Sequence, residues 1–302
     1  MNDEYDLIVA GGGVAGMTAA LYGARSGLKT VVIEQEICGG LANDTHTVEN
    51  FPSYKSIGGM ELMEKVAEQM EENGVQLKDV TEITGFQLEG DKKTVITDEG
   101  PVSGRALILA TGRKPVPLPV ETDWDEHVHY CSICDGNLYK GKNIIVVGGG
   151  NSAFDESLYL AGIGINKITL VEFLEKCPAA EVTQQRAVDT GKIEVHTSTV
   201  IEKINNHGNT CVAEMKDRVT GECFSIEADG IFVFIGQKPA TELFAGKLNL
   251  DSSGYIVADA DMKTNIPGVY AAGDVVAKKY RQLTTAMADG TIAALGVHNY
   301  LC

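Results

Sequence analysis

The sequence has no long hydrophobic run and no excess of basic charge, and each absence narrows the possible functions. No uninterrupted apolar segment approaches the roughly 18 residues that a membrane helix requires, so we expect no membrane span. The 25 basic residues are outnumbered by 42 acidic ones, and the net charge of -17 disfavours nucleic acid and anionic membranes as partners. The acidic start lacks the basic region and cleavage site of a signal peptide, which favours a cytoplasmic protein.

The sequence also lacks a framework of paired cysteines. An odd number of cysteines, seven, in a chain without an export signal suits a reducing compartment. Cys131 and Cys134 stand three positions apart and are followed by Asp135. This spacing lets two sulfurs close and reopen a small disulfide ring without refolding, as a thiol relay requires. A structural zinc site would need a second such pair or histidines at ligand spacing, so we expect redox chemistry and no metal, with zinc binding or simple packing as the alternatives.

What is present begins with a dinucleotide-binding pattern at the N-terminus. Residues 7–10 predict a buried strand, residues 11–16 read Gly-Gly-Gly-Val-Ala-Gly, a helix follows to about residue 26, and a second strand ends at Glu34. Gly11 allows the tight turn, Gly13 lets the backbone approach a pyrophosphate at the helix N-terminus, and Gly16 lets helix and strand pack closely. Glu34 can accept hydrogen bonds from a ribose diol.

The same pattern recurs after the cysteine pair. Residues 144–147 predict a strand, residues 148–153 read Gly-Gly-Gly-Asn-Ser-Ala, a helix runs to about residue 161, and the next strand ends at Glu172. Two such patterns in 302 residues, with 44% apolar residues, suit a chain of about two domains. Two bound dinucleotides could exchange electrons; the alternative is that the second pattern is a vestigial packing module.

The remaining chain contains the expected domain boundary. A polar loop over residues 38–52 precedes a helix at about residues 60–72, and short strands with a hairpin turn at residues 89–91 lead to a buried strand at residues 106–112. Prolines at alternate positions from Pro115 to Pro119 predict a stiff extended linker. Residues 110–115 resemble residues 235–239, and a final helix is expected at about residues 284–300.

Taken together, these motifs resemble those of the low-molecular-weight thioredoxin reductases, FAD-dependent members of the pyridine nucleotide-disulfide oxidoreductases. The resemblance covers nearly the whole chain and depends on both glycine patterns, residues 39–41, residues 48–52, the pair Cys131 and Cys134, Gly273-Asp274 and residues 280–283. It implies an α/β fold of two Rossmann-like, three-layer ββα dinucleotide-binding domains, the second inserted into the first. Residues 1–116 and 244–302 would form the FAD domain, and residues 117–243 the NAD(P)-like domain that carries the redox pair.

The resemblance also implies which residues bind each cofactor. In the FAD domain, the expected residues are Gly11, Gly13, Val14, Ala15, Gly16, Glu34, Gly39, Gly40, Leu41, Asn50, Ala110, Gly112, Gly273, Asp274, Arg281, Gln282 and Leu283. In the second domain they are Gly148, Gly150, Asn151, Ser152 and Glu172.

In the chemistry that the resemblance implies, reduced flavin passes two electrons to the Cys131–Cys134 disulfide. Cys134 would be the thiol next to the flavin, Cys131 would attack thioredoxin, and Asp135 would act as the acid and base for the thiols. The inserted domain would have to rotate between flavin and thioredoxin, and a homodimer is expected. His127 and His129 could assist, but solvated loop histidines are the preferred interpretation.

The sequence departs from the family where NADPH-dependent members carry a basic cluster for the 2′-phosphate. Residues 172–178 here read Glu-Phe-Leu-Glu-Lys-Cys-Pro, and an acid at the strand end accepts bonds from free ribose hydroxyls and repels a 2′-phosphate. We therefore expect NADH to be preferred over NADPH as the donor. The alternatives are ferredoxin or a deazaflavin as donor, a peroxiredoxin or another thioredoxin-like protein as acceptor, or a flavin-bound redox sensor.

Overall fold

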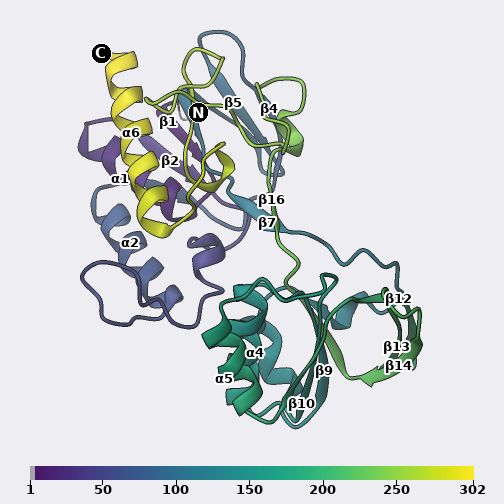
Figure 1. Ribbon diagram of the computed structural model, residues 1–302. Helices are drawn as coiled ribbons and strands as arrows, with labels where there is room; N and C mark the ends of the chain where they lie inside the picture. Colours follow the sequence, from purple (N-terminus) through teal and green to yellow (C-terminus); the bar gives the residue numbers. More distant parts are fainter. Residues whose placement is uncertain (1–3) are drawn as a thin grey trace. The chain divides into compact units, whose positions relative to one another are not determined.

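A computed structural model describes residues 4–302 (Figure 1), and these residues divide into two compact units. Unit 1 comprises the chain up to Lys114 together with Lys238–Cys302, and unit 2 comprises Pro115–Gln237. Within the described residues, no helix is both long and apolar enough to cross a bilayer.

Unit 1 is built on a seven-stranded sheet with the order β3-β2-β1-β6-β5-β4 and with β17 beside β6. The strands β1, β2, β3, β6 and β17 are parallel, whereas β4, β5 and β6 are antiparallel neighbours. Their bounds are β1 Glu4–Ala10, β2 Thr30–Ile33, β3 Gln76–Lys78, β4 Ile83–Gln87, β5 Lys93–Thr97, β6 Gly100–Leu109 and β17 Val269–Ala271.

Helices cover one face of the parallel part of this sheet, and the antiparallel strands β4 and β5 pack on the other face. Strand β6 belongs to both parts, because it pairs with β5 through residues 100–104 and with β1 through residues 103–109. Helices α1 (Val14–Arg25), α2 (Gly59–Glu72) and α6 (Leu283–Leu301) pack on strand residues such as Leu7 and Val9. The alternating residues Ile8 and Ala10 face a second core that contains Phe86 of β4 and Phe244. Because successive strand side chains point to opposite faces, the fully apolar sequence of residues 7–10 fits a strand buried on both sides. The result is the three-layer ββα arrangement.

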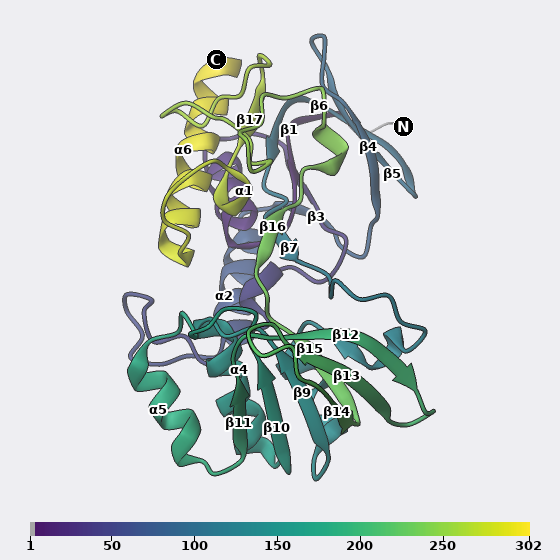
Figure 2. The same cartoon turned by 45° about the vertical axis from the view of Figure 1, so that its right-hand side comes forward.

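Unit 2 repeats this plan around a five-stranded parallel sheet, ordered β11-β10-β9-β15-β8 (Figure 2). Its strands are β8 Val128–His129, β9 Asn143–Val147, β10 Lys167–Val171, β11 Ile193–His196 and β15 Gly230–Val233. Helices α4 (Asn151–Ile163) and α5 (Glu181–Asp189) pack with the core of one face. The antiparallel strands β12 (Thr199–Asn206), β13 (Cys211–Asp217) and β14 (Cys223–Ala228) pack with the core of the other.

Two short strands connect the units, and they pair with each other. These are β7 (Arg113–Pro115) and β16 (Gln237–Pro239), the two segments whose sequences resemble each other. Residues beyond β16 fold with unit 1, since Ala240 N–H donates to Gly112 O and Thr111 Oγ1 donates to Ala240 O. The compact units therefore divide at 114/115 and 237/238, whereas the sequence places the limits at 116/117 and 243/244.

Candidate active site

In unit 1, the strands that carry predicted site residues end on one row of the sheet. The register aligns Ile33 of β2, Ala10 of β1, Leu109 of β6 and Ala271 of β17. Each strand end is followed within two residues by a predicted site residue, and these are Glu34, Gly11, Ala110 and Gly273. Dinucleotides bind outside the carboxyl ends of parallel strands in folds of this kind, so the row marks the candidate cofactor site.

The glycine turn between β1 and α1 has little room for side chains. Gly11 has a φ of +106°, and a Cβ there would lie 2.3 Å from Ala110 O. A Cβ on Gly16 would lie 1.9 Å from Gly11 O. Gly13 differs, because no heavy atom lies within 4 Å of its Cβ position and it precedes the first turn of α1, which begins with Val14 and Ala15. Open space at a helix N-terminus with free N–H groups suits a pyrophosphate.

Glu34 and the loop at residues 39–41 close around this turn. The Glu34 carboxylate accepts hydrogen bonds from Gly12 N–H at 2.5 Å and from Glu36 N–H at 3.0 Å. Gly39 N–H donates to Gly12 O, and the Cβ position of Gly40 lies 3.3 Å from Gly13 Cα. The structure thus brings Gly39, Gly40 and the adjoining Leu41 to the first glycine turn, although they are far from it in sequence.

The C-terminal part of unit 1 returns to the same row of strand ends. Gly273 has a φ of +80° and abuts α1, because a Cβ there would lie 2.7 Å from Ala15 Cβ. Asp274 pairs with Arg113 at 3.2 Å and with Lys278 at 3.6 Å. At residues 280–283, Arg281 stacks over Tyr255 with Cζ 4.1 Å from the ring centroid. Asn50 Nδ2 donates to Gln282 Oε1 at 3.2 Å, and Gln282 caps α6 immediately before Leu283.

Several polar atoms around this row are buried without a hydrogen-bond partner in the protein. They are Asn43 Oδ1, Arg113 Nε, Arg281 Nε and Asp274 Oδ1, the last with only the longer ion pair to Lys278 at 3.6 Å. Buried polar groups are normally satisfied, so orphaned donors and acceptors beside an open glycine turn fit a large polar cofactor. The residues present therefore fit FAD.

Unit 2 places its predicted nucleotide residues on the corresponding edge. Val147 of β9 is in register with Val171 of β10, and the next residues are Gly148 and Glu172. Gly148 has a φ of +120°, and a Cβ there would lie 2.4 Å from Phe234 O. Gly150, like Gly13, has no heavy atom within 4 Å of its Cβ position and precedes a helix.

Glu172 repeats the placement of Glu34. It is 8% exposed, accepts a hydrogen bond from Leu174 N–H at 2.8 Å, and has Oε2 2.6 Å from the Cβ position of Gly149. Asn151 is exposed at the start of α4 and accepts a hydrogen bond from Ala180 N–H, and Ser152 beside it is also exposed. A carboxylate at this place suits a ribose diol better than a phosphate.

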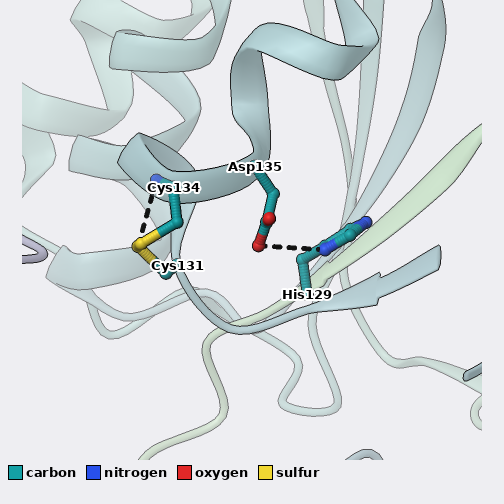
Figure 3. Close-up of a disulfide and its surroundings, with 4 residues drawn as sticks. All are labelled: His129, Cys131, Cys134 and Asp135. Atoms are coloured by element: carbon teal, nitrogen blue, oxygen red, sulfur yellow. Dashed lines mark hydrogen bonds and ion pairs between the residues drawn. A yellow bond between two sulfur atoms is a disulfide. The ribbon is translucent and has the colours of Figure 1, made fainter. Parts of the chain in front are cut away.

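The cysteine pair follows β8 at the start of the short helix α3 (Ser132–Asp135). The structure joins Cys131 and Cys134 in a disulfide, and Cys134 N–H donates to Cys131 Sγ at 3.1 Å (Figure 3). Cys131 is half-buried and Cys134 is exposed. Because β8 is parallel to β15 and β9, the pair lies beyond the same carboxyl edge of the sheet as Gly148.

Asp135 does not stand alone beside the pair, and here the interpretation of His129 as a solvated loop histidine is wrong. The His129 side chain is only 10% exposed, and its Nδ1 lies 3.0 Å from Asp135 Oδ2 (Figure 3). Burial lowers the pKa of His129, while the nearby Asp135 charge opposes that shift. The sequence contains no sign of this pairing, since it depends on how β8 and α3 pack.

The other five cysteines are free. Cys38 lies over Gly12, and burial together with the charge of Glu34 raises its pKa to about 12. Cys177 has the equivalent place over Gly149, and burial and Glu172 raise its pKa as well. These two thiols are packing residues that remain protonated at neutral pH.

Comparison with known proteins gives consistent matches over the full length. Residues 5–290 match the family described as pyridine nucleotide-disulphide oxidoreductase. A thioredoxin reductase of Peptoclostridium acidaminophilum is 39% identical over 311 residues, covering 100% of this chain and 98% of the relative. A 34.2 kDa protein in the rubredoxin operon of Clostridium pasteurianum is 39% identical, covering 99% and 97%.

Solved structures agree with these matches. Thioredoxin reductase of Lactococcus lactis, in its FR conformation, superposes with a TM-score of 0.90 at 37% identity, covering 98% of this chain and 99% of that one. The T. acidophilum thioredoxin reductase gives a TM-score of 0.89 at 31% identity, covering 98% of each chain.

Proposed function

Because the chain belongs to the pyridine nucleotide-disulphide oxidoreductases, and among them to the low-molecular-weight thioredoxin reductases, we propose that it reduces the disulfide of a thioredoxin with electrons from NADH. It is an FAD-dependent oxidoreductase. The observation that carries the proposal is the Cys131–Cys134 disulfide with Asp135 directly behind it, on the unit that also carries the second glycine pattern.

Unit 1 supplies the residues that would hold FAD, and all of them lie within the proposed FAD domain, residues 1–116 and 244–302. Gly13 and the first turn of α1 would bind the pyrophosphate, Glu34 the adenosine ribose, and Asp274 the ribityl side. The Asn50–Gln282 pair and Arg281 would line the ring. When bound, FAD supplies two electrons to a disulfide.

The thiol steps belong to unit 2. Once the pair is reduced, the Cys131 thiolate attacks one sulfur of the substrate disulfide and forms a mixed disulfide. The substrate S–S bond breaks, and the other substrate sulfur leaves and takes up the proton that Cys131 gave up. Cys134 then loses its proton to Asp135 and attacks Cys131 Sγ, so the enzyme disulfide reforms and the second substrate sulfur leaves as a thiol. Two electrons and two protons pass from the pair to the substrate.

Turnover tests this proposal directly. Purified protein should be yellow, should bleach when donor is added, and should recover colour when oxidised thioredoxin follows. The reduced flavin could fail to recover its colour with any thioredoxin and recover it with the disulfide of a peroxiredoxin or a glutaredoxin-like protein. That result would identify a different acceptor and leave the proposed disulfide chemistry unchanged. If the protein binds FAD and reduces no disulfide, the proposal is wrong and a flavin-bound redox sensor becomes the better interpretation.

Support for NADH comes from the likeness between the two glycine edges. In both units, a carboxylate at the end of the second strand lies against the middle glycine and accepts a backbone N–H two residues later. A 2′-phosphate would meet the Glu172 charge at this place, so NADPH should bind poorly. Flavin reduction by NADH, NADPH, reduced ferredoxin and a reduced deazaflavin, measured in parallel, decides the donor. Rapid reduction by NADPH alone contradicts the proposal.

Gly150 offers a variant that separates nucleotide donors from the others. Its φ of -79° and its empty Cβ position let Gly150→Ala fold normally, but the added methyl would occupy the space where a pyrophosphate approaches α4. We expect Gly150→Ala to lose about tenfold or more in reduction by NADH, and to keep reduction by dithionite. If ferredoxin or a deazaflavin is the donor, the variant retains full activity with that donor.

Location and assembly complete the proposal. Five free cysteines beside one redox disulfide suit the reducing cytoplasm, where we place the enzyme.

We also propose a homodimer. Helix α6 leaves Ile292, Leu295 and Tyr300 exposed by 38%, 44% and 48%, which favours a further apolar contact. Light scattering of the purified holoenzyme measures the mass, and a monomer at micromolar concentration would contradict this assignment.

A further inference from the structure

A continuous series of polar contacts leads from Asp135 to the surface of unit 2. His129 Nδ1 lies 3.0 Å from Asp135 Oδ2, and its Nε2 lies 2.6 Å from the Tyr139 hydroxyl. The same hydroxyl lies 3.2 Å from His127 Nδ1. His127 Nε2 in turn lies 3.6 Å from Glu126 Oε1, and the Glu126 side chain is 84% exposed. Each contact therefore joins one buried or half-buried group to the next, ending in solvent.

The donors and acceptors along this series can all point in one direction. A carboxylate only accepts, so the Asp135 contact requires the proton of neutral His129 on Nδ1. His129 Nε2 then accepts from the Tyr139 hydroxyl, and the Tyr139 oxygen accepts from His127 Nδ1–H. With this assignment each member donates to the next one toward Asp135. His127 Nε2 carries no hydrogen, so it pairs with the Glu126 carboxylate only after it takes up a proton from solvent.

Packing fixes the positions of Tyr139 and His129 and limits their exposure to solvent. Tyr139 is 3% exposed, and a Cβ on Gly230 would lie 2.5 Å from its ring, so β15 tolerates only glycine there. Phe232 of β15 stacks on His129 with ring centroids 5.1 Å apart. Burial, followed by nearby negative charge, raises the pKa of Tyr139 to about 12 and keeps its hydroxyl neutral.

The charged and titratable groups around the two central side chains come from every element that packs on them. They are Asp135 and His127 toward His129, and Asp135, Asp229, Glu126, His127 and Lys142 toward Tyr139.

We propose that His129 is a positioning residue for Asp135 and that, with Tyr139 and His127, it carries protons between Asp135 and solvent during thiol-disulfide exchange. When Cys134 leaves the disulfide as a thiolate, it takes the proton of a protonated Asp135, which becomes the carboxylate that accepts from His129 Nδ1–H. One proton then enters from solvent at His127 Nε2. The Nδ1 proton of His127 passes to the Tyr139 oxygen, the hydroxyl proton of Tyr139 passes to His129 Nε2, and the Nδ1 proton of His129 passes to Asp135, which is protonated again. The reverse shift releases the proton of Cys134 when it attacks. This inference rests on the proposed disulfide chemistry but needs neither the donor nor the acceptor.

The test is the opening of the Cys131–Cys134 disulfide by dithiothreitol in the full-length holoenzyme. Attack of dithiothreitol on Cys131 Sγ releases Cys134, which takes up one proton, and rapid alkylation followed by peptide mass spectrometry identifies the molecules in which Cys134 is the free thiol. His129→Asn places an amide N–H where Nδ1–H of the imidazole donates to Asp135, but it cannot pass a proton from Tyr139 to Asp135. We expect it to open about tenfold more slowly near neutral pH, less than the roughly 10²–10⁴-fold that a direct acid or base contributes. Added imidazole should restore most of the rate.

Two further variants keep the test decisive. Tyr139→Phe leaves the His129–Asp135 contact but interrupts the path to His127, so it should also slow opening and flatten the pH profile. His196→Gln is the matched control, because His196 also pairs with a carboxylate, at 2.9 Å from Glu194, on the opposite edge strand of the same sheet. It should match the wild-type rate.

Two results would overturn the relay. In the first, the disulfide opens at the wild-type rate in both His129→Asn and Tyr139→Phe. In the second, it opens slowly in His129→Asn, imidazole does not restore the rate, and Tyr139→Phe opens at the wild-type rate. Failure of the proposed function is seen separately, because a protein that reduces no thioredoxin still gives these dithiothreitol rates.

Discussion

At the scale of single residues, Cys134 separates cofactor binding from disulfide chemistry. Cys134→Ser removes one sulfur from an exposed position on α3 and no part of the unit 1 cofactor edge. We expect the variant to keep stoichiometric FAD and to lose thioredoxin turnover by at least about 10³-fold, since the enzyme disulfide cannot reform. Flavin absorbance and steady-state turnover measure the two effects. Cys223→Ser, at an exposed free cysteine of β14, is the control and should behave as wild type.

The free cysteines give a prediction about pH. Because burial raises the pKa of Cys38 to about 12, its thiol stays protonated far above pH 8, and only the thiolate reacts quickly with alkylating agents. Native protein treated with iodoacetamide at pH 8 should therefore be modified at exposed Cys223 and spared at Cys38, as peptide mass spectrometry would show. Unfolding should abolish the difference. Modification of Cys38 in the native protein at the rate of Cys223 would contradict the burial described here.

At the scale of elements, two glycines of the same turn should behave in opposite ways. Gly16→Ala puts a methyl 1.9 Å from Gly11 O and should destabilise unit 1 by about 1–3 kcal/mol, with loss of FAD. Gly13→Ala meets no protein atom within 4 Å, and its φ of -67° suits alanine. It should leave the flavin-free protein as stable as wild type and weaken FAD binding by about tenfold or more.

Urea unfolding of the flavin-free proteins, with FAD titration, distinguishes these variants. Equal loss of stability in both would mean that Gly13 is needed for packing rather than for the cofactor.

The sequence predicted the helices, strands and turns, because these depend mainly on residues that are close together in the chain. Both strand, turn and helix patterns form as expected, and α1, α2 and α6 lie within a few residues of the predicted helices. Local patterning could not predict the contacts that join distant segments, such as the Asn50–Gln282 hydrogen bond or the approach of Gly39 to Gly12. Resemblance to a family supplied the residues involved, but not their geometry.

The neighbourhood of Asp135 was the least predictable part of the site. His129, Tyr139 and Phe232 come from three elements, and their contacts depend on the order of β8 and β15 in the sheet. A histidine two residues before a cysteine has no distinctive periodicity, so the sequence favoured solvent exposure. The place of Glu172, by contrast, follows from the sequence, because the residue directly after a strand at a glycine turn has a fixed place in this fold. The preference for NADH that it suggests stays a prediction.

At the scale of the whole molecule, the single tryptophan reports on one unit only. Trp124 is 1% exposed in unit 2, and its Nε1–H donates to Gly208 O at 2.8 Å. A ligand stabilises the structure that binds it, so removing FAD should lower the unfolding midpoint of unit 1. We expect far-ultraviolet circular dichroism to show an earlier transition in the flavin-free protein, and tryptophan fluorescence to keep its midpoint. Coincident shifts in both signals would mean that the units unfold together.

The pairing of β7 with β16 has a consequence for the architecture of the gene. The chain leaves unit 1 and returns to it through two strands that lie side by side, so the intervening segment has neighbouring ends. A short turn joining residues 114 and 238 would connect the two pieces of unit 1 into one continuous polypeptide. Unit 2 could likewise be exchanged for another domain without long added linkers, because its two ends are neighbours. Such a layout lets recombination swap the thiol-bearing module between relatives without disturbing the strand order of the host.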